Sequence, residues 1–437
     1  MQRHNTMRTA GTMTDIQTQF IDVSQLRIGM FIYLDMGWMD HPFPVSNFKI
    51  SSQEQINTIR SLGLEQVRYA PDKSTQAQQE SAAVTANIVM PVTQESEQNR
   101  AARLRRELLA CQAVSLQVCE KQFNHAAQTL RQVNEQAHAQ PELARELTEK
   151  LIQDFLGEVL SEDEAAIRLL SEKAGEKTSL HSINVTVISL LLGKAMQLSK
   201  ADMLQLGLGA LLHDIGKVNL PDRLRWMDEQ FNHAEKLLFH EHVSHSVALA
   251  RKMALAPSAM LLIAQHHEYI DGSGYPSRVS GDKISPLARI VALVNHYDNL
   301  CNPSNPALAV TPHEALSQIF TQGKARFDAA TLTAFIRMMG IYPPGSVVQL
   351  TDDRYALVVS VNSSRPIKPK VIIHDSRVPR EDALVINLEH EKQLGIHRSL
   401  KPVQLPKAAY DYLSPRKRLC YFFERGLEAG TTLGESS

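Results

Sequence analysis

The chain has 437 residues, 43% of them hydrophobic, and its 46 Lys and Arg residues nearly balance its 47 Asp and Glu residues. This length allows roughly two to four domains, and the hydrophobic content is enough for packed cores rather than wholesale disorder. The balanced charge lacks the basic excess typical of nucleic-acid binders, and no apolar run reaches the roughly 20 residues that span a bilayer. We therefore expect a cytoplasmic protein that binds neither nucleic acid nor membrane.

The N-terminal residues 15–72 predict a small α+β module. The apolar run at 29–36 indicates a strand, and a second strand is expected at 66–69. Between them, the serines at 51–52 are suitable N-caps for a helix.

Three longer segments follow this module. Residues 73–160 start as a polar linker and continue as a long helix, whose apolar stripe over 101–139 fits both a dimerising coiled coil and a core helix. A homodimer through this helix is therefore one expectation. Residues 161–340 are helical in pattern, and residues 341–425 carry β-rich runs separated by polar turns.

Histidine is the residue type that indicates where chemistry lies. Nine of the 17 histidines fall between His181 and His296. The four cysteines form no CxxC pair and no framework spacing, which argues against a thiolate zinc site or a disulfide scaffold.

A His-Asp pair marks the end of one strongly apolar helix. Ser199 is a suitable N-cap for this helix, and Gly216 marks its end, so His213 and Asp214 are expected in its last turn. Burial of such a pair is costly unless something compensates it. A divalent metal compensates directly, because imidazole and carboxylate are its ligands. A buried His-Asp hydrogen bond without metal is the alternative.

Four further histidines lie beside apolar helical faces. His181 precedes the pair by one helix, His242 follows it, and His266 and His267 close another helix. All of them can point into one bundle core, which is how metal sites are built in helical proteins. Each alone could equally be an ordinary core or surface histidine. Three others are expected on solvated faces: His233, His240 and His245.

The loop after the double histidine is rich in turn residues. Gly272 and Gly274 allow backbone to approach a ligand closely, Tyr275 supplies a ring with a hydroxyl, and Pro276 fixes the loop. Together with Asp271, these residues would form an ordinary turn elsewhere. Their position beside the candidate ligands favours a substrate-binding role.

In this order, the elements from His181 to Pro276 resemble the HD-GYP domain, a branch of the HD metal-dependent phosphohydrolases. The resemblance covers roughly 165–340, and the stretch at 26–48 is similar to the small domain that often precedes HD-GYP domains in proteobacteria. It implies a mainly α fold, in which an all-helical HD-type metal-binding bundle is flanked by a small N-terminal α+β module and a small β-rich C-terminal module.

The resemblance also implies an activity. The family hydrolyses cyclic di-GMP to pGpG and on to GMP at a site that holds two or three metals, often Fe or Mn. For this chain we expect two divalent metal ions, Fe or Mn, with Mg, Ni or Zn as alternatives. Cyclic di-GMP is therefore the expected ligand, and a diguanylate cyclase or another signalling protein is an expected partner.

The site residues carry over by position. The implied metal ligands are His181, His213, Asp214, His242, His266, His267 and Asn295. Of these, His181 and His213 would hold one metal, and Asp214 would bridge to a second. The implied substrate-binding residues are Lys217, Asp271, Gly272, Gly274, Tyr275, Pro276 and Arg289. Asp214 and Lys217 are also the implied catalytic residues, because Lys217 would neutralise charge on the phosphate.

One departure from the family pattern concerns the first metal. Asn295 stands where the family has an Asp ligand, and an amide offers no charge, so we expect this metal to bind weakly or to be lost. Asp298, three positions on, shares the helix face only approximately and is not favoured as a replacement. Three hypotheses stay open: an attenuated cyclic di-GMP phosphodiesterase, a degenerate protein that binds the nucleotide or a partner, and a phosphohydrolase of another nucleotide.

Overall fold

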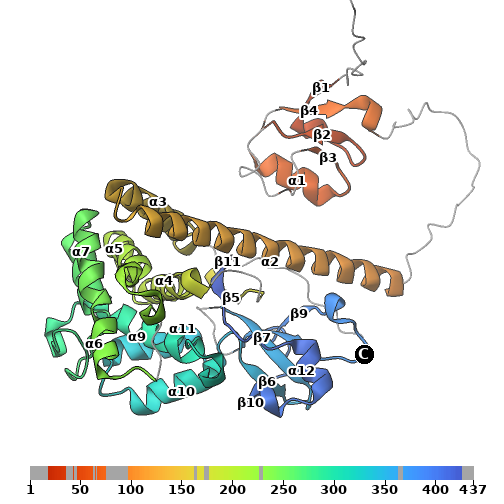
Figure 1. Cartoon of the computed structure of the whole chain (residues 1–437). Helices are drawn as coiled ribbons and strands as arrows, with labels where there is room; N and C mark the ends of the chain where they lie inside the picture. The colour runs from red at the N-terminus through yellow and green to blue at the C-terminus, as the bar shows by residue number, and fades with distance from the viewer. Residues whose placement is uncertain are drawn as a thin grey trace, which may run out of the picture. The chain divides into compact units, whose positions relative to one another are not determined.

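The computed structural model describes residues 18–35, 43, 47–62, 64, 66–74, 97–161, 165–171, 177–225, 230–362 and 368–425. The chain divides into two compact units, residues 1–94 and 95–437, each of which is described by itself. Most of the regular structure is helical (Figure 1). The residues at 75–96, where the polar linker was predicted, lie outside the described part, as do the ends of the chain.

The first unit is a small antiparallel sheet with one helix. Its strands pair in the order β1-β4-β2-β3. They are β1 (Gln19–Asp22), β2 (Phe31–Tyr33), β3 (Asn47–Lys49) and β4 (Gln66–Ala70). Helix α1 (Gln53–Ser61) begins at Ser52, whose hydroxyl accepts a hydrogen bond from the Gln55 amide. Ile32, Ile56 and Ile59 are fully buried between sheet and helix, because they occupy the inner face of each element.

The second unit is a helical bundle joined to a larger sheet. The helices before the loop at 266–285 are α2 (Glu97–Gln136), α3 (Pro141–Val159), α4 (Lys177–Ala195), α5 (Lys200–Leu212), α6 (His233–His240), α7 (His242–Lys252) and α8 (Pro257–Gln265). After this loop come α9 (Pro286–Cys301), α10 (Pro312–Gln322), α11 (Ala329–Met339) and α12 (Lys407–Leu413). None of the helices in the described part of the chain has the length and apolar character that a membrane span requires.

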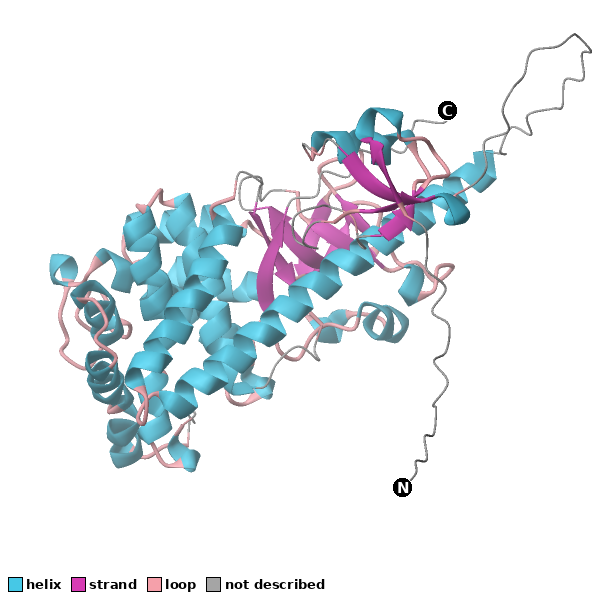
Figure 2. Ribbon diagram, turned by 90° about the horizontal axis from the view of Figure 1, so that it is seen from above, coloured by secondary structure: helices cyan, strands magenta, loops and turns pink. Residues whose placement is uncertain are grey.

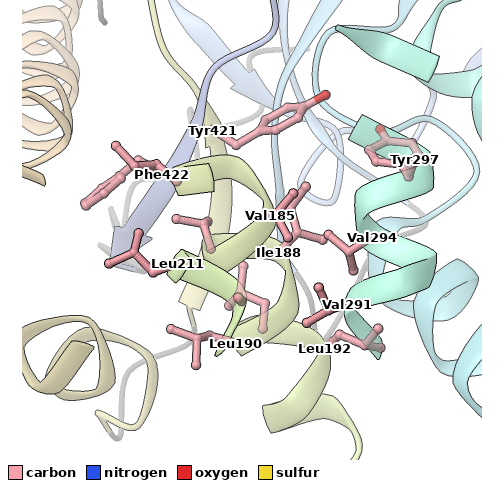
Figure 3. Close-up of a cluster of buried hydrophobic side chains, with 14 of the residues drawn as sticks. Val185, Ile188, Leu190, Leu192, Leu211, Val291, Val294, Tyr297, Tyr421 and Phe422 are labelled. Atoms are coloured by element: carbon pink, nitrogen blue, oxygen red, sulfur yellow. The ribbon is translucent and has the colours of Figure 1, made fainter. Parts of the chain in front are cut away.

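Helix α4 is the centre of the bundle. Its mean hydropathy is high and it is apolar on all sides, because α5, α9 and strand β11 (Tyr421–Arg425) pack around it. Figure 3 shows Val185 and Ile188 of α4 facing Val294 of α9 and Tyr421 of β11. Such burial of whole aliphatic side chains contributes about 1.5–3 kcal/mol for each residue. The bundle therefore holds the ends of α4, α5 and α9 in fixed relative positions.

The long helix α2 is a core helix in its second half. Phe123, Leu130 and Val133 are buried against the bundle, whereas none of the residues 99–118 is buried. The N-terminal half of α2 lies beside the larger sheet of this unit (Figures 1 and 2). There the Gln112 side chain forms two hydrogen bonds with the Val385 backbone. The apolar stripe is thus used within the chain, and the predicted homodimer stays a prediction.

The larger sheet combines distant parts of the chain. Its strands pair in the order β10-β6-β7-β5-β11, with β8 and β9 extending from β7. They are β5 (Ala165–Leu169), β6 (Val347–Leu350), β7 (Tyr355–Asn362), β8 (Lys370–Ile373), β9 (Val385–Asn387), β10 (Ile396–Leu400) and β11. All pairs are antiparallel, and Arg168 of β5 lies opposite Ser360 of β7 and Phe422 of β11. The β-rich segment after 340 therefore shares its sheet with β5, which lies between α3 and α4 in the sequence.

Strand β5 was not predicted. Residues 161–340 were expected to be helical in pattern, yet Ala165–Leu169 lies between β7 and β11, which both follow much later in the sequence. A run of five residues with a single β-branched side chain is too short to give a periodic signal. Its conformation comes from the two neighbouring strands, which are distant in sequence.

Candidate metal centre

His213 and Asp214 lie at the point where α5 ends, as predicted. The Nδ1 of His213 donates to the carbonyl of Ala210 at 2.7 Å, one turn back in the same helix. The lone pair of Nε2 is then directed away from the helix, 3.3 Å from Asp214 Oδ2. His213 is completely buried and Asp214 is 9% exposed. Asp214 also begins the short 3-10 helix η3 (Ile215–Asn219), so its carboxylate leaves the axis of α5.

His181 joins this pair from α4. Its Nε2 lies 3.3 Å from His213 Nε2 and 3.6 Å from Asp214 Oδ2. One ligand atom from each of the three residues lies within 4.8 Å of the others. These are the residues that were predicted to hold the first metal.

Three more histidines form a second group with Asp214, and two of them approach its other oxygen. The Nδ1 atoms of His242 and His266 donate to the carbonyls of Phe239 and Ile263, at 2.6 and 2.7 Å. Their Nε2 atoms lie 3.3 and 3.8 Å from Asp214 Oδ1. With His267 they form a second group, again with ligand atoms within 4.8 Å of one another. Asp214 therefore belongs to both groups, with one oxygen toward each.

The protonation states of the histidines suit metal binding. Burial lowers the pKa of His242 to about 4 and lowers the pKa of His266 and His267 well below the usual value. Neutral imidazole, which carries a free lone pair, is the form that binds metal. Burial alone would raise the pKa of Asp214, but Lys217, His213 and His242 outweigh it and hold this pKa well below its usual range.

Two buried atoms of this cluster lack a hydrogen bond in the described part of the chain. They are Asp214 Oδ1 and His267 Nε2. Buried polar atoms without partners are costly, and each such atom in a native protein calls for an explanation. A set of five imidazoles around one shared carboxylate suits divalent ions such as Fe, Mn, Ni or Zn. The residues present thus fit two divalent cations that share Asp214.

Asn295 and Asp298 both lie on the inner face of α9. The Asn295 side chain is buried, and its amide oxygen accepts a hydrogen bond from Asn299 at 2.9 Å. Asp298 does not act as a replacement ligand: its Oδ2 lies 2.6 Å from His181 Nδ1, on the far side of the ring from Asp214. The sequence analysis missed this contact, although Asp298 lies only one helical turn beyond Asn295.

Tyr275 is the loop residue that the structure brings to the cluster. Its ring stacks on His267, with centroids 4.4 Å apart, and its amide donates to the His267 carbonyl at 3.1 Å. His240 also stacks on Tyr275, at 3.7 Å and nearly parallel. The expectation that His240 is a bystander on a solvated face was therefore wrong, and the single sequence clue was its position two residues before His242.

The loop is held in place by a buried carboxylate. Glu268 is 1% exposed, and its Oε1 accepts hydrogen bonds from the amides of Ser277 and Arg278 at 2.7 and 3.0 Å. Gly274 packs directly on the backbone of His267 and Glu268. The loop conformation therefore depends on the same segment that carries two of the candidate ligands.

Three other predicted residues have contacts of different kinds. Lys217 forms an ion pair with Asp214 Oδ2, so its charge lies at the cluster. The Arg289 guanidinium instead bonds to Asp282 and Asp328, and none of its described contacts is to the histidines. The Asp271 carboxylate accepts hydrogen bonds from Ser273 within an exposed turn. The substrate contacts of Arg289 and Asp271 stay predictions.

Two families match the chain. A domain of unknown function (DUF3391) matches residues 18–148, and the HD domain matches residues 164–331. The HD domain thus accounts for residues 164–331 of the chain. The resemblance to the HD-GYP branch, with a small domain ahead of it, is confirmed.

Several known proteins are similar to this chain. It is 28% identical over 360 residues to a Pseudomonas aeruginosa protein named as a cyclic di-GMP phosphodiesterase, with 80% of this chain and 84% of the relative covered. It is 31% identical over 167 residues to a Vibrio cholerae protein named as a 3′3′-cGAMP-specific phosphodiesterase, with 38% of this chain and 36% of the relative covered. A solved HD-GYP protein from Bdellovibrio bacteriovorus aligns with a TM-score of 0.39 at 16% identity, covering 73% of this chain and 98% of that one.

Proposed function

We propose that this HD-domain protein is a metal-dependent phosphodiesterase that hydrolyses cyclic di-GMP. The observation that carries the proposal is the position of Asp214 between two histidine groups, directly beside the loop that holds Tyr275. The sequence similarity to a cyclic di-GMP phosphodiesterase extends over four fifths of the chain and supports the choice of substrate. Fe or Mn is the proposed metal.

The ligand residues determine where the reaction takes place. His181, His213 and Asp214 would hold one cation, and Asp214 would share a second with the other histidine group. Two divalent cations in such a site supply Lewis acidity toward a phosphodiester and its attacking water. The rings of His213 and His242 each donate a hydrogen bond from Nδ1 to a backbone carbonyl, which fixes each ring with Nε2 toward the site. Little reorganisation would therefore be needed when the cations bind.

Lys217 and Tyr275 would contact the substrate. The Lys217 ammonium lies at Asp214, where it adds positive charge opposite the phosphate as negative charge develops. Burial raises the pKa of Tyr275 well above its usual value, and the carboxylate of Asp214 adds to the effect. The hydroxyl therefore stays protonated and can donate a hydrogen bond to a phosphate or base, while both neighbouring imidazoles hold the ring in place.

The test is anaerobic turnover of cyclic di-GMP by the purified chain with Fe(II) or Mn(II), with pGpG and GMP separated by chromatography. Product above the metal-only blank is expected, and it should vanish in His213→Ala and Asp214→Ala. Full activity in either variant would refute the metal assignment. 3′3′-cGAMP belongs in the same assay, because a relative is named for that substrate.

A second candidate function rests on Asn295, whose amide brings no charge to the first half of the site. In this case the protein binds cyclic di-GMP or a signalling partner, such as a diguanylate cyclase, without turnover. Asn295→Asp separates the two functions. A rise in turnover supports an attenuated enzyme, whereas binding without product in both forms supports a signalling module.

A further inference from the structure

The carboxylate of Asp298 is fully buried, and its hydrogen-bond partners are one imidazole and two side-chain amides. Its Oδ2 bonds to His181 Nδ1 at 2.6 Å. Its Oδ1 accepts from the side-chain amides of Asn184 and Asn302, at 2.8 and 2.9 Å. His181 and Asn184 are three residues apart on α4, and so share one helix face. Asn302 is the C-cap residue of α9 and follows Asp298 by four residues.

The same two asparagines also bind the backbone of the C-terminal segment. Asn184 donates to the Leu419 carbonyl at 2.8 Å and accepts from the Tyr421 amide at 2.9 Å. Asn302 donates to the same carbonyl at 3.0 Å and accepts from the Leu419 amide at 2.8 Å. Each carboxamide is therefore bonded through both its oxygen and its nitrogen, which fixes its orientation.

The C-terminal segment is itself firmly anchored. The Cys420 carbonyl accepts from the Leu170 amide at 2.9 Å, and Tyr421 begins β11 opposite Leu169 of β5. Residues 419–421 thus form a fixed backbone support. A continuous set of hydrogen bonds leads from this support through two amides and one carboxylate to a candidate metal ligand.

We infer that residues 419–421 position the first half of the metal site, and that Asn184 and Asn302 are positioning residues that act through Asp298 on His181. A carboxylate on the Nδ1 of a metal-binding imidazole fixes its tautomer and raises the basicity of Nε2. It also brings to this half of the site, through the ring, a negative charge that Asn295 does not supply. The inference rests on the metal centre of the proposed function.

The test measures metal binding rather than turnover. Mn(II) binding to the full chain is followed by anaerobic equilibrium dialysis, and the Mn(II) pair is followed by EPR. Asn302→Ala should weaken one of two Mn(II) equivalents by roughly 10- to 100-fold, leave the other unchanged, and convert the EPR signal of a coupled pair to that of an isolated ion. Asp298→Asn, which keeps the shape of the side chain, should weaken the same equivalent and serves if Asn302→Ala does not fold.

Tyr421→Phe is the matched control. It removes a buried hydrogen bond of the same segment, from the Tyr421 hydroxyl to the Pro344 carbonyl, but it leaves the contacts of both asparagines in place. Its Mn(II) binding should equal that of the native protein. If Asn302→Ala and Asp298→Asn bind Mn(II) as the native protein does, the inference is overturned but the proposed function is not. The same holds if these variants weaken both Mn(II) equivalents equally. Native protein that binds no Mn(II) would overturn the metal centre of the proposed function, and the inference with it.

Discussion

The loop that carries Tyr275 leaves no space for a side chain at Gly274. A Cβ atom there would lie 2.4 Å from the His267 carbonyl oxygen, 2.5 Å from Glu268 Cα and 2.7 Å from the Tyr269 amide nitrogen. All three are backbone atoms, so no change of rotamer relieves the overlap. Gly274→Ala is therefore expected to push the loop away from His267.

The contacts that this shift breaks set the size of the effect. Carbon and oxygen atoms approach to about 3.3 Å, so the Cβ must move by about 1 Å. That movement breaks the 3.1 Å hydrogen bond from the Tyr275 amide to His267, and it disturbs the ring stack. One net hydrogen bond and one aromatic pair are together worth about 1–3 kcal/mol. If Tyr275 contacts the substrate, the same loss lowers kcat/KM by about 5- to 150-fold.

The assay is kcat/KM for cyclic di-GMP, with bound metal measured on the same samples. Gly157→Ala is the matched control, because no atom lies within 4 Å of its Cβ position. Ser273→Ala tests an exposed side chain of the same loop, whose hydroxyl donates a hydrogen bond to Asp271. The reasoning is refuted if kcat/KM of Gly274→Ala stays within twofold of native, or if either control loses as much.

Three further predictions concern single side chains. His240→Ala removes a ring stacked on Tyr275 and should raise KM for cyclic di-GMP about 2- to 10-fold, whereas His240→Phe should restore it; failure of Phe to do so contradicts a stacking role. Burial lowers the pKa of His296 to about 4, whereas its pKa in the unfolded chain is near 6.5. Between these two values the unfolded chain binds a proton at His296 and the folded chain does not, so the unfolding free energy falls as the pH falls. From pH 7 to pH 5, the unfolding free energy in urea should drop about 2 kcal/mol more in native protein than in His296→Phe, and equal drops count against this. Glu424→Ala leaves its buried partner Arg168 unpaired and should lower the unfolding free energy by about 3–5 kcal/mol. Glu107→Ala, which removes an exposed ion pair, should lower it by less than about 0.5 kcal/mol. Similar losses in the two variants would argue against a stabilising buried ion pair.

The candidate ligands could be predicted because each signal is local. His213, His242 and His266 each sit at the end of an apolar helical stretch or beside one, and their order along the chain carried the family resemblance. The helix that ends at His213 also follows from sequence, because its cap and its apolar face lie within a few residues of each other. That Asp214 is shared between two groups came from the resemblance and not from spacing.

The support behind His181 could not be predicted, because its parts are distant in sequence. Asn302 and Leu419 are separated by 117 residues, and no local pattern connects them. The same holds for the use of α2: an apolar stripe fits a coiled coil and a core helix equally, and only tertiary contacts of Phe123 and Leu130 decide between them. Strand β5 is a third case, since its conformation depends on two strands made much later.

The pairing of Asn184 with the C-terminal segment also has a consequence for the order of events during synthesis. The two hydrogen-bonded groups, Asn184 Oδ1 and the Tyr421 amide, are 237 residues apart. At about 5–20 residues per second, a ribosome needs roughly 12 to 47 s to travel that distance. Until residue 421 is made, β5 has at most one of its two neighbours, β7, and His181 lacks the backbone support of residues 419–421. The candidate metal centre therefore gains its backbone support only after residues 419–421 have been synthesised.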